Sequence, residues 1–147
     1  MQEYQRKQLL ERVNKESATI GADIPDRIEV QGEELDLRTF VFEIKRRDTI
    51  PDGEHERVEQ AKRNLRRERL ERLERIEENR VDFETGEEIA ASIIGIDRAL
   101  DALDNLRSAD MEGEARRQEA MDQKRWMSFL KKALGQDDAS GSKRGGY

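Results

Sequence analysis

The sequence predicts a mainly α-helical domain, a helical hairpin or bundle with a small β-hairpin near residues 27–37. Apolar residues recur at helical spacing through long charged segments, and one short stretch alternates as strands do. Apolar residues make up 34% of the chain and charged residues 42%, so we expect a thin core and long solvated helix faces. The 147 residues suffice for one domain, expected at 1–135, before a disordered Gly- and Ser-rich tail at 136–147.

The N-terminal third predicts a helix, a β-hairpin and a second, shorter helix. Residues 2–16 form the first helix, with an apolar side of Tyr4, Leu9, Leu10 and Val13. Two alternating runs flank Gly32 and predict the β-hairpin. Asp36 is the expected N-cap of the short helix, because its carboxylate can accept from backbone N–H groups of the first turn. The apolar face of that helix comprises Leu37, Phe40, Val41 and Ile44.

Residues 52–106 predict the central feature, an antiparallel hairpin of an arginine-rich helix and an acidic helix. Asp52 is the expected N-cap of the first helix, and the second starts at Asp82 or at a capping box from Thr85 to Glu88. Gly95 is the expected point of close helix crossing. We expect the arginines of one helix to pair with the acids of the other along a shared apolar seam. That seam comprises Val58, Ala61, Leu65, Leu73 and Ile76 on one helix and Ile89, Ile93, Ile96, Leu100 and Leu103 on the other.

Residues 113–134 predict the last helix, and its end, KRWMSFLKKALG, is strongly amphipathic. Gly135 is the expected helix stop. One arc of this helix carries the apolar residues Trp126, Met127, Phe129, Leu130, Ala133 and Leu134, and the other carries the cations Lys124, Arg125, Lys131 and Lys132.

Two basic islands lie within a chain of net charge -6. Residues 62–75 carry 7 basic against 3 acidic side chains, and residues 123–136 carry 4 against none. Any nucleic-acid or lipid contact must therefore come from a local patch. The opening MQEYQRKQLLERV lacks the apolar region of a signal peptide, and no run approaches the roughly 18 apolar residues that span a bilayer, so we expect a cytoplasmic protein.

The residue pattern disfavours an enzyme and predicts no cofactor, metal or small-molecule substrate. His55 is the sole histidine and has no cysteine partner for a metal site, so we interpret it as a solvated residue of a first helical turn. Asp97, Asp101 and Asp104 share one helix side, but hard cations require six or more oxygens, usually from several segments. We interpret these carboxylates as solvated or arginine-paired.

The leading functional hypothesis is a non-enzymatic protein-interaction or adaptor module, or a self-associating one. An RNA- or ribosome-associated factor using the basic islands is the first alternative. A membrane-surface protein anchored by Trp126 and Phe129 is the second. The candidate contact residues for these functions are Arg63, Arg66, Arg67, Lys124, Arg125, Trp126, Phe129, Lys131 and Lys132.

The stretches IEVQGEELDLRTFVFEIKRRDT, SIIGIDRALDAL and KRWMSFLKKALG resemble a family of small uncharacterised proteins from halophilic archaea, a domain of unknown function. The resemblance extends from about Tyr4 to Gly135. The preference for arginine over lysine and the acidity agree with that origin. The resemblance implies a cytoplasm at high salt, where exposed charge contacts are screened, and it implies no activity.

Overall fold

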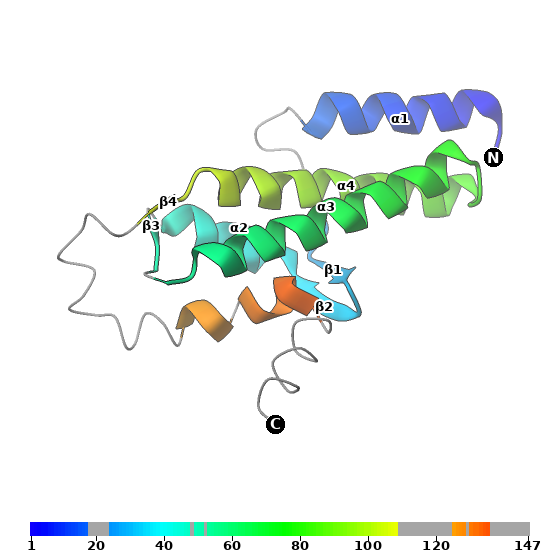
Figure 1. Cartoon of the computed structure of the whole chain (residues 1–147). Coiled ribbons are helices and arrows are strands. Elements are labelled where there is room, and N and C mark those ends of the chain that lie inside the picture. The colour runs from blue at the N-terminus through cyan, green and yellow to red at the C-terminus, as the bar shows by residue number, and fades with distance from the viewer. Residues whose placement is uncertain (18–23, 48, 52, 109–124, 129, 136–147) are drawn as a thin grey trace.

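The computed structural model describes residues 1–17, 24–47, 49–51, 53–108, 125–128 and 130–135. Its elements are, in order, α1 (Glu3–Ser17), β1 (Arg27–Val30), β2 (Glu33–Asp36), α2 (Leu37–Arg46), β3 (Thr49–Ile50), α3 (His55–Glu77), α4 (Phe83–Asp104) and β4 (Arg107–Ser108) (Figure 1). Residues 125–128 and 130–135 are also helical and are called the C-terminal segment below. The predicted mainly α fold is confirmed, whereas the tail and the first half of the predicted last helix lie outside the described residues.

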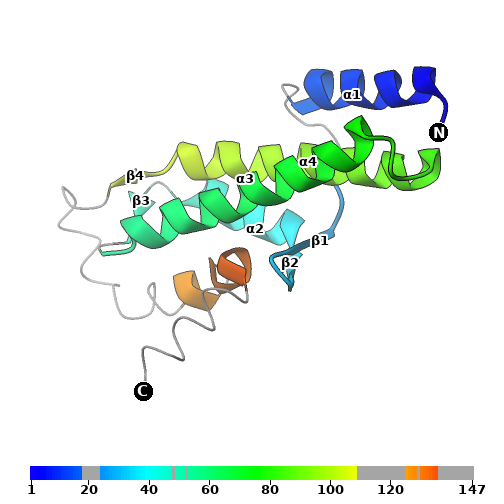
Figure 2. The ribbon, with the colours of Figure 1, turned by 45° about the vertical axis from the view of Figure 1, so that its right-hand side comes forward.

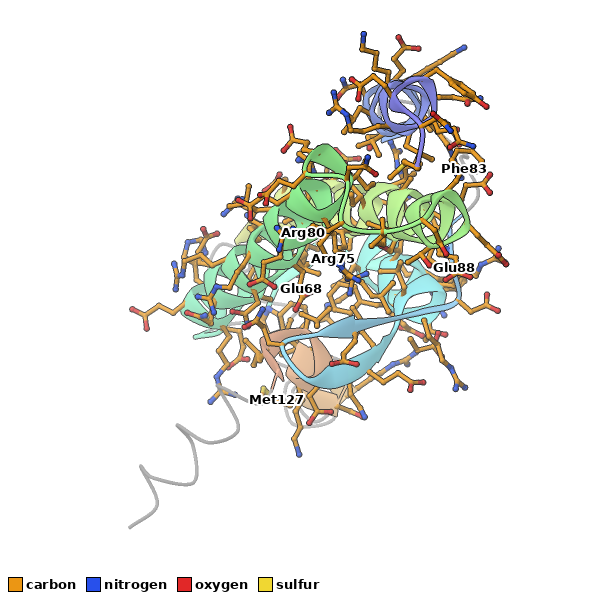
Figure 3. The ribbon with its side chains drawn as sticks, turned by 90° about the vertical axis from the view of Figure 1, so that its right-hand side faces the viewer. Glu68, Arg75, Arg80, Phe83, Glu88 and Met127 are labelled. Carbon is orange, nitrogen blue, oxygen red and sulfur yellow. The ribbon has the colours of Figure 1, made fainter. Side chains whose placement is uncertain are left out.

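Helix α4 is the central element of the fold. It contacts α1, α2 and α3, and Figure 3 shows α1 on one side of it with α2 and α3 on the others. Its predicted seam is buried apart from the half-buried Leu100, but Ala90, Ile94 and Ala99 are buried as well. Gly95 is confirmed as a crossing point, because an added Cβ would collide with the Leu37 side chain of α2.

The predicted hairpin of α3 and α4 is antiparallel. Val58 and Leu103 belong to one core cluster, and Ile76 and Ile89 belong to a second cluster at the other end. Ion pairs cross the seam from Arg69 to Asp97 at 2.7 Å and from Lys62 to Asp104 at 2.9 Å. Other α3 arginines turn towards the β-hairpin instead: Arg67 donates to the Gln31 side chain and Arg72 to the Glu29 carbonyl. The apolar seam therefore holds the two rods together, and charge pairing between them is local.

The predicted β-hairpin is also present. Strands β1 and β2 pair antiparallel, with Val30 opposite Glu33. The connecting Gln31 and Gly32 have φ of 47° and 85°, the positive values that a two-residue primed turn requires. Asp36 caps α2 as predicted, accepting from the Thr39 backbone N–H at 3.5 Å. The apolar face of α2 predicted from Leu37 to Ile44 is buried.

The first helix and the start of α3 depart from the prediction. Tyr4 is 68% exposed, because five residues at about 100° each place it roughly 140° around α1 from the buried Leu9. Glu54 is the N-cap of α3 and makes no side-chain capping bond, whereas Asp52, the predicted N-cap, lies outside the described residues. The Glu54 carboxylate accepts from Trp126 instead. Of the two predicted start points of α4, Asp82 is the N-cap, and its side chain accepts from the Thr85 backbone N–H at 2.8 Å.

A short parallel pairing of β3 with β4 was not predicted. It sets Thr49 opposite Arg107 and Ile50 opposite Ser108, so the chain leaving α2 lies beside the chain leaving α4 (Figure 1). Two residues per strand give too little alternation to be recognised in a sequence. The pairing closes the end of the molecule opposite the turn between α3 and α4.

Candidate interaction site

The C-terminal segment packs against α2, α3 and the β-hairpin (Figure 2), on a contact surface that is called the groove below. Its apolar residues Trp126, Leu130, Ala133 and Leu134 are buried in the same cluster as Phe40 of α2 and Leu65 of α3, among others. This amphipathic helix therefore docks on its own domain. The side chains that fill the groove follow the i, i+4, i+7, i+8 spacing of a helix docked through one face.

Trp126 is the deepest anchor of this docking, with 0% exposure. Its indole Nε1 donates to Glu54 Oε1 at 2.8 Å, and the Arg47 guanidinium lies 4.8 Å from the ring centroid. The indole therefore gains a charged acceptor at its edge and a cation over its face. Trp126 is therefore not the exposed anchor that the membrane-surface alternative requires, because it has both an apolar cover and a polar partner within its own domain.

Asn64 holds the other end of the C-terminal segment and is 0% exposed. Its side-chain amide donates to the carbonyls of Leu134 at 2.7 Å and Ala133 at 3.3 Å. These carbonyls belong to the last turn of a helix, where backbone acceptors lack partners within the helix. Gly135 then turns the chain with φ of 74°, as the predicted stop. Sequence reasoning missed Asn64, since a polar residue in an apolar stripe carries no sign of its distant partner.

The predicted cations of the C-terminal segment face acids of the body. Arg125 Nη2 donates to both carboxylate oxygens of Glu43 at 3.1 Å, and Lys132 lies 3.9 Å from Glu33. Lys131 is exposed. Lys124 and the Phe129 side chain lie outside the described residues.

The predicted arginines of α3 do not join those cations on one bare basic face. Arg63, Arg66 and Arg67 are exposed, but Arg63 donates to Gln60 at 2.8 Å and Arg67 to Gln31 at 3.0 Å. Arg67 and Lys132 each contact a residue of the β-hairpin, Gln31 and Glu33, whereas Arg125 contacts Glu43 of α2. A phosphate backbone is bound by a track of cations, and among the described candidates Arg63, Arg67 and Arg125 each donate to a side chain of their own domain.

A hollow of about 330 Å³ lies between α3 and the β-hairpin, and its walls are charged. Glu29, Glu68, Glu71, Arg72 and Arg75 line it, and Figure 3 shows Glu68 and Arg75 on this side of α3. Arg72 donates to Glu68 at 3.4 Å and to the Glu29 carbonyl at 2.6 Å, so these three residues are joined across the hollow. The lining residues include neither a histidine nor a hydroxyl nucleophile.

The three aspartates of α4 do not form a cation site. Asp97 accepts from Arg69 and Asp104 pairs with Lys62. Burial disfavours the charged Lys62 ammonium, but hydrogen bonds to Asp104 and Glu59 outweigh burial and raise its pKa. Across the described parts of the chain no group of three or more His, Asp or Glu could hold a metal ion. His55 is exposed in the first turn of α3, as predicted.

The outer face of α2 carries an exposed aromatic residue with three cations one turn away on the same helix. Phe42 is 55% exposed, and its neighbours one turn away on the helix surface are Arg38, Thr39, Lys45 and Arg46. The Arg46 guanidinium lies 5.5 Å from the Phe42 ring centroid. All ten residues of α2 are described, and none of the exposed ones is acidic. These five residues are called the Phe42 patch below.

The fold and these surfaces define a small helical-bundle protein with a docked C-terminal helix. The family model described as "Family of unknown function (DUF5788)" matches residues 1–131, and the chain belongs to this family. No curated protein and no solved structure matches the chain. Among the described residues no helix is long and apolar enough to cross a membrane.

Proposed function

We propose that this protein is a non-enzymatic interaction module that binds an acidic protein surface through the Phe42 patch. The observation that carries the proposal is the exposed Phe42 with Arg38, Lys45 and Arg46 one turn away, on a helix with no exposed acid. Aromatic residues and arginine are the types enriched in protein interfaces and their hot spots.

Charge complementarity selects the partner. The chain has a net charge of -6, whereas the exposed face of the short helix α2 carries three cations and is locally basic. Arg38 is held by Asp26 at 3.0 Å and Arg46 by the Phe42 ring, so both are oriented before a partner arrives. A carboxylate-bearing surface with an apolar centre fits a patch that has an aromatic centre and a basic rim.

Several observations favour a protein over RNA. The patch is one helix face about two turns long, and among the cations predicted to contact RNA, Arg63 and Arg67 donate to amides and Arg125 donates to an acid of their own domain. Nucleic-acid sites instead draw their affinity from many phosphate contacts.

We propose that the protein works in a cytoplasm at high salt, as the resemblance to halophilic archaeal proteins implies. At about 1 M salt the Debye length falls to about 3 Å, so screening weakens the charge attraction between the partners but not their apolar contact. Burying the exposed half of Phe42 is worth about 1 kcal/mol, or roughly fivefold in affinity. Under those conditions Phe42→Ala is expected to weaken binding more than Arg46→Ala.

The test is affinity capture from native lysate with wild type, Phe42→Ala, Arg46→Glu and Tyr4→Ala as baits, with and without nuclease. Tyr4 is the matched control, because it is an aromatic residue exposed on α1, away from the patch. We expect a protein held by wild type and Tyr4→Ala and lost by the two patch variants, unaffected by nuclease. Nuclease-sensitive capture would favour the RNA alternative, and equal capture by all four baits would refute the Phe42 patch as the contact.

A further inference from the structure

We infer that the acidic surface bound by the Phe42 patch belongs to a second copy of this chain, at the start of its helix α4. This inference rests on the proposed function, because it names the partner of the same patch. The acids concerned are Glu84, Glu87 and Glu88, called the acidic stripe below. In a symmetric dimer, the patch of each copy contacts the stripe of the other.

The acidic stripe is an exposed face of α4 whose charges are not neutralised. Its three residues are exposed and lie at i, i+3 and i+4, which places them on one side of the helix. None of the three forms an ion pair or a side-chain hydrogen bond with the parts of the chain that the structure describes. By contrast, Asp97 and Asp104 of the same helix pair with cations of α3. Like charges one turn apart repel, so cations from another molecule stabilise this face.

Apolar side chains border the stripe. Phe83 lies four residues before Glu87, Ala91 lies three residues after Glu88, and both are half-buried. Figure 3 shows Phe83 and Glu88 on the outer side of α4, away from α3. The surface therefore combines carboxylates for the cations of the Phe42 patch with apolar contact for its aromatic ring.

The two surfaces match in length and in charge. The patch extends from Arg38 to Arg46, about 12 Å along its helix, and the stripe with Ala91 extends about 10 Å from Glu84. The patch carries three cations, and the stripe carries three carboxylates. One helix face can therefore lie along the other with each cation near an acid.

The patch and the stripe also lie on the same side of α4. Leu37, the first residue of α2, lies against Gly95, which follows Glu88 by two helical turns and shares its side of α4. The strands that follow α2 and α4 pair in parallel, so α2 continues from Gly95 towards the C-terminal end of α4. Helix α2 therefore covers this side of α4 after the stripe and forms a step beside it. A second copy related by a two-fold axis places its own α2 on that step.

The test exchanges the charges of the two surfaces in the full-length chain. The patch variant carries Lys45→Glu and Arg46→Glu, the stripe variant carries Glu87→Lys and Glu88→Lys, and the combined variant carries all four changes. All four positions are exposed, so circular dichroism should show the helix content of wild type. Association is measured by sedimentation at about 0.1 M salt, where charges up to about 10 Å apart still interact.

We expect wild type to dimerise below about 1 mM, and the patch and stripe variants each to associate about tenfold more weakly, because like charges then face each other. The combined variant should dimerise again, and so should an equimolar mixture of the patch and stripe variants, because each cation again faces an acid. The matched control is Glu11→Lys with Asp101→Lys, which makes the same change in net charge at exposed acids outside the stripe and should dimerise as wild type does.

A wild type that stays monomeric up to about 1 mM overturns the second copy as the partner. So does a patch or stripe variant that dimerises as wild type does, or a combined variant that stays monomeric. None of these results removes the Phe42 patch as a site for another acidic protein. That role fails separately, when the Phe42→Ala and Arg46→Glu baits capture the same proteins as wild type.

Discussion

Replacing Asn64 by alanine is expected to undock the C-terminal segment and leave the rest of the fold in place. The side chain is fully buried, and its amide serves the Leu134 carbonyl at 2.7 Å and the Ala133 carbonyl at 3.3 Å. Leaving a buried acceptor without a partner costs about 1 to 3 kcal/mol. We therefore expect docking of the segment to weaken by about 2 to 3 kcal/mol, a factor of roughly 30 to 150.

The assay is acrylamide quenching of Trp126 together with hydrogen exchange of the segment and of α4. In Asn64→Ala, quenching and exchange of the segment should rise, while the amides of α4 keep their protection because α1, α2 and α3 still cover that helix. The control is Asn105→Ala, since Asn105 also donates to a backbone carbonyl, that of Asp101 at 3.0 Å, but is exposed. Its effect should stay within about 0.5 kcal/mol. Unchanged protection of the segment in Asn64→Ala would refute this explanation of how the helix is held.

The remaining predictions concern packing, capping and titration. Gly95→Val should lower the free energy of unfolding in urea by about 2 to 3 kcal/mol, because the new side chain meets Leu37; a stabilised variant would contradict the crossing. Hydrogen bonding to Thr85 lowers the pKa of Asp82 below its usual 3.8, so its stabilising contribution is present above that pH and is lost as pH falls below it. The stability advantage of wild type over Asp82→Asn should therefore shrink during acid titration below pH 3.8, and a constant difference would argue against the cap. The pKa of Lys62 is raised above its usual 10.5, so its stabilising contribution is present below that pH and is lost at higher pH. In urea unfolding, the stability advantage of wild type over Lys62→Gln should therefore persist up to pH 10.5 and decline above it. Phe42→Ala should change the unfolding midpoint by no more than about 0.5 kcal/mol equivalent, which separates lost binding from lost folding.

Features set by local patterns could be predicted from the sequence. The spacing of Ile89, Ile93 and Ile96 marks a helix seam, and Gly32 between alternating runs marks a hairpin. Asp36 and Asp82 announce helix starts because capping depends on residues three positions apart. Gly95 could be predicted as a crossing, since a helix tolerates glycine where a neighbour approaches closely.

Features set by distant partners could not be predicted. Glu54 has the sequence context of a first-turn acid, yet it accepts from a tryptophan 72 positions later. In the sequence, Arg67 and Arg72 belong to a basic island, but in the structure residues of the β-hairpin accept hydrogen bonds from both. The Phe42 patch could not be predicted because Phe42 is one more apolar residue beside those of the buried face of α2, such as Phe40 and Ile44. An exposed aromatic among cations becomes visible only when the buried face is known.

A photo-cross-linkable phenylalanine analogue at position 42 most directly tests whether the exposed face of α2 is where this protein meets its partner. We expect irradiation to attach an acidic protein there, with a lower yield when Arg46→Glu is added. The same analogue at position 4 should give no such adduct. Equal adducts at positions 4 and 42, or attachment of nucleic acid alone at 42, would contradict a protein-binding role for the Phe42 patch.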